Sequence, residues 1–146
     1  TTAKKVLSCI NRKNADELRQ LCADGVLTAE TVEKLRVFMK NYASVDAALA
    51  ALQPMCTAPA AAAALEEFSR MLWFIRDMGY ANNTRVDFSL TNDMSYYSGV
   101  AFRGYIQGIP TGVLSGGQYD KIMRKMGKSA SAVGFAVYMD LLDAAH

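Results

Sequence analysis

Hydrophobic positions in the first half of the chain recur every three or four residues, the spacing of one face of an α-helix. The longest helix is predicted to begin near Pro59, which suits a first helical position, and to end before Gly79, which suits a left-handed cap. Glu66 and Arg70 are spaced to pair on one of its faces. Its apolar stripe predicts a buried face and consists of Leu65, Phe68, Leu72 and Ile75.

Further helices are predicted upstream of this one. One is expected to follow Thr28, a good N-cap residue. Shorter helices fit residues 6–22 and 45–52. The alanine-rich segment 57–64 could serve as a linker, but its composition favours helix with a short preceding turn. The helix after Thr28 has its apolar positions at Val32, Leu35, Met39 and Tyr42.

After residue 83 the hydrophobic period changes to two, which is typical of half-buried β-strands. The strand that begins near Thr111 is expected to end at Gly116 and Gly117, and the last strand is apolar enough to be buried. The predicted elements are strands at 86–90, 100–106, 111–114 and 132–138, and helices at 118–126 and from about Asp140.

This order of elements predicts an α+β fold without internal repeats. The helical region is expected to cover residues 1–82, and the antiparallel sheet with its flanking helices residues 83–146. At 146 residues the chain is long enough to form a hydrophobic core without disulfides or metal.

Composition excludes several function classes. The chain carries 16 Lys and Arg against 14 Asp and Glu, which argues against sequence-independent nucleic-acid binding. No apolar run approaches the length of about 20 residues that a membrane span needs, and no signal peptide is evident. Three scattered cysteines favour reduced thiols and a cytoplasmic location. Because the only histidine is His146, no metal site and no histidine-based catalytic site is expected. No cofactor is expected either.

Three segments resemble motifs of the histidyl-tRNA synthetase family. Residues 92–103 match R-G-L-D-Y-Y-T-G-x-x-F-E around Tyr96, Tyr97 and Gly99, residues 116–120 match G-G-R-Y-D, and residues 132–136 match the start of the third class II motif. The resemblance implies part of a class II aminoacyl-tRNA-synthetase-like antiparallel sheet, preceded by a helical insertion. The first two class II motifs are absent.

The resemblance also implies a histidine site, because phenolic hydroxyls can exchange hydrogen bonds with an imidazole and glycines let a ligand approach the backbone. The alternative is that the tyrosines are ordinary core aromatics and the glycines mark bulges or close packing. The implied ligand-binding residues are Tyr96, Tyr97, Gly99, Gly116, Gly117 and Tyr119.

Two arginines of the family's pattern fall on Asn92 and Leu141, while Arg103 replaces an acid and Tyr138 a glycine. A synthetase needs such arginines to stabilise phosphate charge, so adenylation is not expected and no catalytic residue is assigned. The pattern is similar to the family's non-catalytic branch, which senses histidine and activates the catalytic subunit of ATP phosphoribosyltransferase in the first step of histidine biosynthesis. It implies that catalytic subunit and histidine as partners, and homo- and hetero-oligomers.

Two other interpretations remain open at this point. The chain could be a fragment of a divergent histidyl-tRNA synthetase that still forms the adenylate. It could also be an interaction module without a ligand, whose basic run over residues 121–128 contacts RNA or an acidic surface, although a solvated helix face is the favoured explanation of that run.

Overall fold

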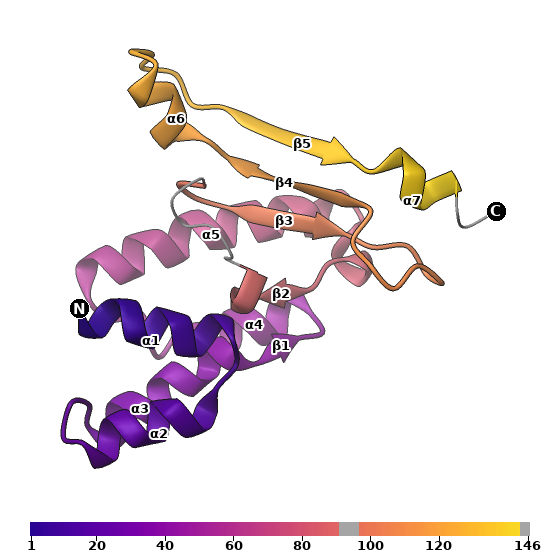
Figure 1. The fold of residues 1–146 in the computed structure, drawn as a ribbon. Helices are drawn as coiled ribbons and strands as arrows, with labels where there is room; N and C mark the ends of the chain where they lie inside the picture. Colours follow the sequence, from indigo (N-terminus) through magenta and orange to yellow (C-terminus); the bar gives the residue numbers. More distant parts are fainter. Residues whose placement is uncertain (91–96, 144–146) are drawn as a thin grey trace. The chain divides into compact units, whose positions relative to one another are not determined.

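The computed structural model describes residues 1–90 and 97–143 (Figure 1). The chain divides into two compact units, Thr1–Ser89 and Leu90–His146. The first is helical apart from a two-stranded ladder, and the second is built on a three-stranded antiparallel sheet. The α+β class is therefore confirmed, whereas the domain boundary expected after residue 82 stays a prediction.

Helices α1 (Thr2–Asn11), α2 (Ala15–Ala23) and α3 (Ala29–Arg36) surround one core of the first unit. The Thr28 hydroxyl accepts the Thr31 N–H at 3.2 Å, so the predicted N-cap is confirmed. Burial, followed by the nearby Glu17 carboxylate, raises the pKa of the Cys9 thiol and keeps it protonated. The core consists of Cys9, Leu18, Leu21 and Val32.

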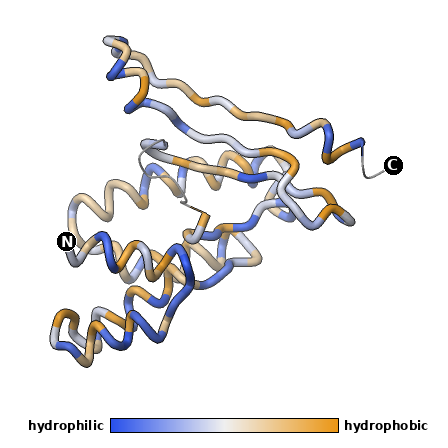
Figure 2. The backbone as a smooth tube through the Cα atoms, in the orientation of Figure 1, coloured by the Kyte–Doolittle hydropathy of each residue, from blue (hydrophilic) through white to orange (hydrophobic). Residues whose placement is uncertain are grey.

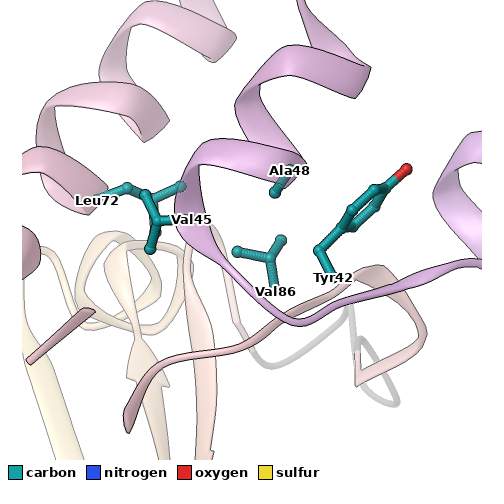
Figure 3. Packing of buried hydrophobic residues seen from close by; sticks show 5 residues of the cluster. All are labelled: Tyr42, Val45, Ala48, Leu72 and Val86. Carbon is teal, nitrogen blue, oxygen red and sulfur yellow. The ribbon is translucent and has the colours of Figure 1, made fainter. Parts of the chain in front are cut away.

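A second core lies among α4 (Val45–Leu52), α5 (Pro59–Asp77) and the ladder of β1 (Asn41–Tyr42) with β2 (Val86–Asp87). Figure 3 shows its side chains converging from these elements, with the Tyr42 hydroxyl pointing away from the other four. That hydroxyl donates to the Val37 carbonyl at 2.9 Å, which satisfies a polar group that would otherwise be costly to bury. The core consists of Tyr42, Val45, Ala48, Leu72 and Val86.

Both predicted ends of α5 are confirmed. Pro59 is the first helical residue, where its missing N–H costs nothing. Gly79 adopts φ +86°, and its N–H bonds the Arg76 carbonyl while the Tyr80 N–H bonds the Ile75 carbonyl, which is the Schellman arrangement. The helix is preceded by a turn at residues 53–55 and a bend at Ala58.

One prediction for the first unit is wrong at the end of α3. The helix ends at Arg36 and passes into the 3₁₀ turn η1 (Val37–Met39), so the helical spacing does not reach Tyr42. Tyr42 instead pairs with Val86 across the ladder and belongs to the second core. Long-range strand pairing therefore overrides a local periodicity.

The strand predicted over residues 86–90 ends at Asp87 and continues as the 3₁₀ turn η3 (Phe88–Leu90), after an earlier 3₁₀ turn, η2 (Ala81–Asn83). The Asp87 carboxylate accepts the Ser89 N–H at 2.9 Å and the Ser89 hydroxyl at 2.6 Å, an arrangement that bends the backbone out of the strand. The Phe88 ring then packs edge-on against Phe38, with centroids 5.2 Å apart. Only the first two positions of the alternating pattern form a strand.

In the second unit, β3 (Ala101–Gly104), β4 (Leu114–Gln118) and β5 (Val133–Val137) form an antiparallel sheet in that order. Helix α6 (Asp120–Lys125) connects β4 to β5, and α7 (Met139–Asp143) follows β5. The predicted hairpin, last strand and two helices are present, but the second strand of the hairpin is Leu114–Gln118 and not residues 111–114. Gly127, at φ +71°, closes α6 as expected.

Two details of this sheet correct the predictions. Gly116 and Gly117 do not end a strand but lie inside β4, because neighbouring rings occupy the space where their side chains would be. The last strand is not buried: it is bonded only to β4 among the described residues, and Val133 and Phe135 are 70% and 66% exposed. Most of β5 is nevertheless coloured as hydrophobic in Figure 2.

Three further findings concern expected absences. Across residues 1–90 and 97–143, no helix is long and apolar enough to cross a membrane. Within the same ranges, no three His, Cys, Asp or Glu side chains gather as a metal-binding group. Cys9, Cys22 and Cys56 are free thiols.

Candidate functional site

The residues that follow Tyr97 form backbone hydrogen bonds with the end of β4. The Ser98 N–H donates to the Gln118 carbonyl at 3.0 Å, and the Gln118 N–H donates to the Val100 carbonyl at 2.9 Å. These two bonds place the Tyr97 ring on Gly117, where an added Cβ would lie 2.6 Å from Tyr97 Cε1. Gly117 therefore leaves the room in which the ring lies.

Tyr119 occupies the corner between β4 and α6. Its N–H donates to the Ala132 carbonyl at 2.8 Å, which fixes the corner against the start of β5. Its ring lies on Gly134, where an added Cβ would be 2.9 Å from Tyr119 Cε2. The corner thus places the Tyr119 ring against the sheet.

The two tyrosine rings form a pair. Their centroids are 5.7 Å apart and their planes are tilted by 32°, within the range of favourable aromatic contacts. Gly117 and Gly134 are direct cross-strand partners, so their missing side chains face the same side of the sheet. Tyr97 and Tyr119 therefore lie together on that side, called here the tyrosine face.

A hollow of about 140 Å³ lies next to Tyr97. It is smaller than the roughly 300–1,000 Å³ of ordinary ligand pockets. Polar groups at its wall come from Tyr97, Arg103 and Ser115, and the Ser115 hydroxyl lies 2.8 Å from the Tyr138 hydroxyl. Its remaining lining residues are Leu90, Ala101, Phe102 and Gly116.

Of the residues predicted from sequence, the structure brings Tyr97, Gly117 and Tyr119 together. Gly116 lines the hollow, but an added Cβ there would meet the Phe102 ring at 2.6 Å, on the opposite face of the sheet. Gly99 precedes β3, and an added Cβ would lie 3.0 Å from Gln118 Cδ, so it serves close packing. Tyr96 lies outside the described residues.

Asp120, the acid of the second motif, is a supporting residue that the sequence analysis did not single out. Its carboxylate accepts the Gln118 side-chain amide at 2.6 Å and the Ala132 N–H at 3.3 Å, so it joins the end of β4 to the start of β5. Gln118 stands where the quoted pattern has arginine. The acid in that motif was the available signal for a structural partner at this corner.

Gly134 and Arg103 were also missed as parts of the site. In the sequence, Gly134 is only part of the third motif. In the sheet it lies opposite Gly117, and paired glycines leave room for rings to pack on the backbone. Arg103 was noted only as a departure from the family's acid. Its place on the hollow follows from strand register, because Arg103 pairs with Ser115.

Comparison with known proteins supports the motif assignment. The family model described as histidyl-tRNA synthetase matches residues 1–142. An ATP phosphoribosyltransferase regulatory subunit of Acetivibrio thermocellus is 27% identical over 139 residues, covering 95% of this chain and 33% of that protein. One from Lactococcus lactis is 32% identical over 80 residues, covering 51% of this chain and 25% of that protein.

A solved structure from Bacillus halodurans, described as an ATP phosphoribosyltransferase regulatory subunit/histidyl-tRNA synthetase, superposes with a TM-score of 0.84 at 26% identity. The match covers 98% of this chain and 38% of that one. The chain thus spans about a third of the length of the curated relatives that match it over most of its length. With the family model matching nearly every residue, the chain belongs to the histidyl-tRNA synthetase family.

Proposed function

We propose that the chain is part of a regulatory subunit of ATP phosphoribosyltransferase that binds histidine on the tyrosine face. The observation that carries the proposal is the ring pair of Tyr97 and Tyr119 on the glycines of β4 and β5. Relatives that bear the regulatory-subunit name support the assignment to histidine biosynthesis. Free thiols at all three cysteines fit the reducing cytosol.

An aromatic ligand with two ring nitrogens suits this face. Paired phenol rings offer a flat apolar surface for an imidazole, and each hydroxyl can donate or accept a hydrogen bond. Because Gly117 and Gly134 have no side chains, the rings lie close to the backbone without steric conflict. The site is formed mainly by the backbone geometry of the sheet, which favours a preformed surface.

Sensing rather than catalysis follows from the residues at the ATP-facing positions of the family's pattern. Leu141, in α7, cannot pair with a phosphate as an arginine does, and Asn92 is neutral as well. Gln118 adds a further neutral residue where the second motif has arginine. Neutral residues at these three positions remove cations that would stabilise the charge that develops during adenylate formation.

Histidine binding would then act through coupled equilibria with a catalytic partner. A ligand shifts the partner's activity only if it binds the two states of the complex with different affinity. The catalytic subunit of ATP phosphoribosyltransferase is the partner that the relatives' names indicate, which makes a hetero-oligomer the working form. Homo-oligomers of the regulatory chain belong to the same proposal.

Calorimetry of histidine binding to the full protein tests the site. Replacing Tyr97 and Tyr119 together by alanine should abolish measurable binding, because both rings that would contact the imidazole are removed. The matched control is Tyr105→Ala, which removes a tyrosine that is 59% exposed in the β3–β4 connection and should leave binding unchanged. Histidine binding that persists in the double variant, with the fold intact by circular dichroism, would remove the assignment.

A second candidate function is that of a divergent histidyl-tRNA synthetase, favoured by the family model that matches the chain. A synthetase exchanges pyrophosphate into ATP when histidine is present, whereas a sensor binds histidine without exchange. Measuring both on one preparation separates the two functions. Histidine-dependent exchange above background would replace the regulatory proposal with the catalytic one.

A further inference from the structure

Arg103 lies on the tyrosine face, one register step from the ring pair. Ala101 pairs with Gly117 and Arg103 pairs with Ser115, so both β3 residues project on the side where Tyr97 and Tyr119 lie. Arg103 and Ser115 also line the hollow beside Tyr97. The guanidinium therefore belongs to the same surface as the rings.

The guanidinium of Arg103 has no hydrogen bond or ion pair with any residue of the described ranges 1–90 and 97–143. The side chain is exposed at the wall of the hollow. An arginine presents several donors in a rigid fork that matches a carboxylate. A fork that is unpaired within the described ranges, at the edge of a ligand surface, can pair with an anionic group.

Ser115 supplies a second polar group at the same place. Its hydroxyl lies 2.8 Å from the Tyr138 hydroxyl at the end of β5. Either hydroxyl can be the donor of this bond. When Tyr138 donates, the proton of Ser115, which lines the hollow, can be donated to a ligand. Arg103, Ser115 and Tyr138 thus form a polar cluster, called here the Arg103 cluster.

The distance between the Arg103 cluster and the tyrosine rings is about the length of a free amino acid. Gly117 carries the Tyr97 ring, and Ser115 lies two residues away on the same side of β4. Two residues of strand correspond to roughly 7 Å. That separation suits a ligand whose aromatic ring and carboxylate are joined by a short aliphatic stem.

We propose that Arg103, assisted by Ser115, binds the carboxylate of the amino acid whose ring lies against Tyr97 and Tyr119. This inference rests on the proposed function and names the residue that selects for the ligand's acid end. The fork pairs with both carboxylate oxygens, and the cluster thereby distinguishes histidine from analogues that lack the acid. Arg103 is a specificity residue and takes part in no chemical step.

Calorimetry with two ligands on the full protein tests it. Histidinol carries the imidazole and amine of histidine but has an alcohol in place of the carboxylate. Wild-type protein should bind histidine more tightly than histidinol. Arg103→Gln should weaken histidine binding by about 10- to 100-fold, the range for a lost charge-assisted hydrogen bond, and leave histidinol binding unchanged.

Two further variants separate this role from a general effect of charge. Arg103→Lys keeps the charge without the fork and should recover part of the histidine affinity. Arg124→Gln makes the same substitution at an exposed arginine of α6 outside the hollow and should bind both ligands as the wild type does.

Three other outcomes would contradict these proposals. Unchanged histidine affinity in Arg103→Gln overturns the role of Arg103 and leaves the histidine site in place. An equal loss for histidine and histidinol also overturns it, because a contact with the carboxylate must weaken histidine binding more than histidinol binding. Absence of histidine binding in the wild-type protein overturns the proposed function itself, and this inference with it.

Discussion

Gly117 and Gly134 are direct partners across β4 and β5, and each carries a tyrosine ring on the same side of the sheet. A Cβ atom at either position would lie within 3.0 Å of a ring atom, closer than real Cβ contacts. The pair of glycines thus leaves a strip of bare backbone against which both rings lie. Their absence of side chains, rather than any reactive group, defines the candidate site.

Gly117→Ala should disrupt this site and weaken the fold. The new methyl group would meet the Tyr97 ring and the Val100 carbonyl, the latter at 2.8 Å, and the carbonyl belongs to a backbone that cannot move freely. We expect a loss of about 1–3 kcal/mol in the free energy of unfolding, the usual cost of overpacking. Histidine affinity should fall at least tenfold. Urea denaturation and calorimetry measure the two effects.

Gly112→Ala provides the control for that variant. An added Cβ at Gly112 meets its neighbours at 3.5 Å or more, an ordinary contact, and its φ is not in the left-handed region. Stability and binding should therefore stay near wild type. If Gly117→Ala proved as harmless as Gly112→Ala, the steric account of the strip would be wrong.

Gly134→Ala should show an intermediate effect. Its new methyl group meets the Tyr119 ring and phenolic oxygen, which can move away, in place of a fixed carbonyl. Binding should weaken because Tyr119 is displaced, while the loss of stability should be smaller than for Gly117→Ala. A stability loss larger than that of Gly117→Ala would contradict this ranking.

Local signals in the sequence were sufficient to predict helix ends, because a single residue determines the backbone conformation there. Pro59 and Gly79 predicted both ends of α5, and Thr28 predicted the start of α3, because each acts on its own helix terminus. The motif tyrosines predicted that Tyr97 and Tyr119 belong to one site, and the structure brings their rings together. Their role in binding histidine remains a prediction.

Failures of the sequence analysis arise where distant residues compete for a segment. Tyr42 fits the spacing of α3, but pairing with Val86 places it in a strand. Gly116 and Gly117 read as strand breakers, yet the Phe102 and Tyr97 rings require them inside β4. In the sequence, Arg103 is only a replacement for the acid of the family's motif. Its position beside Ser115 follows from the strand register, which the sequence does not show. Contacts across strands cannot be inferred from one chain's local pattern.

Truncating Leu72 should destabilise the first unit strongly. Leu72 lies on α5 and is 2% exposed among Val45, Ala48 and Val86 (Figure 3). Leu72→Ala leaves a cavity in a closely packed core and should cost about 2–5 kcal/mol. Phe74→Ala, on the same helix at 65% exposure, should change stability by less than about 0.5 kcal/mol. Equal effects in thermal denaturation would contradict the assigned core.

Lys13 joins α1 to the ladder at the cost of backbone strain. It is the one described residue other than glycine with positive φ, at +52°, and it ends α1 in the place where glycine is common. Its ammonium group bonds Asn41 and lies 3.2 Å from the Asp87 carboxylate. These contacts give a reason for lysine at a position that favours glycine.

Comparing Lys13→Met with Lys13→Gly separates the contacts from the strain. Both variants lose the ammonium group, but only glycine relieves the left-handed backbone, which costs other residues roughly 1–2 kcal/mol. Lys13→Met should therefore be less stable than wild type by about 1 kcal/mol, and Lys13→Gly should be the more stable of the two variants. The reverse order in urea denaturation would show that the turn carries no strain.

Acid should weaken the fold partly through Asp87. Burial raises the pKa of its carboxyl group, but the two bonds from Ser89 and the charge of Lys13 outweigh burial, so the pKa lies below its ordinary value of 3.8. A depressed pKa means that the folded state favours the ionised form. The resulting stabilisation is present above the unfolded-state pKa and is lost as the pH falls through the folded-state value.

Asp87→Asn removes that titration and gives the test. The difference in unfolding free energy between wild type and Asp87→Asn should be largest near neutral pH and should shrink as the pH falls from about 5 toward 2. Ser89→Ala removes one bond that lowers the pKa, so its pH dependence should lie between those two proteins. A difference that grows in acid would mean that burial dominates and that the folded-state pKa of Asp87 is raised.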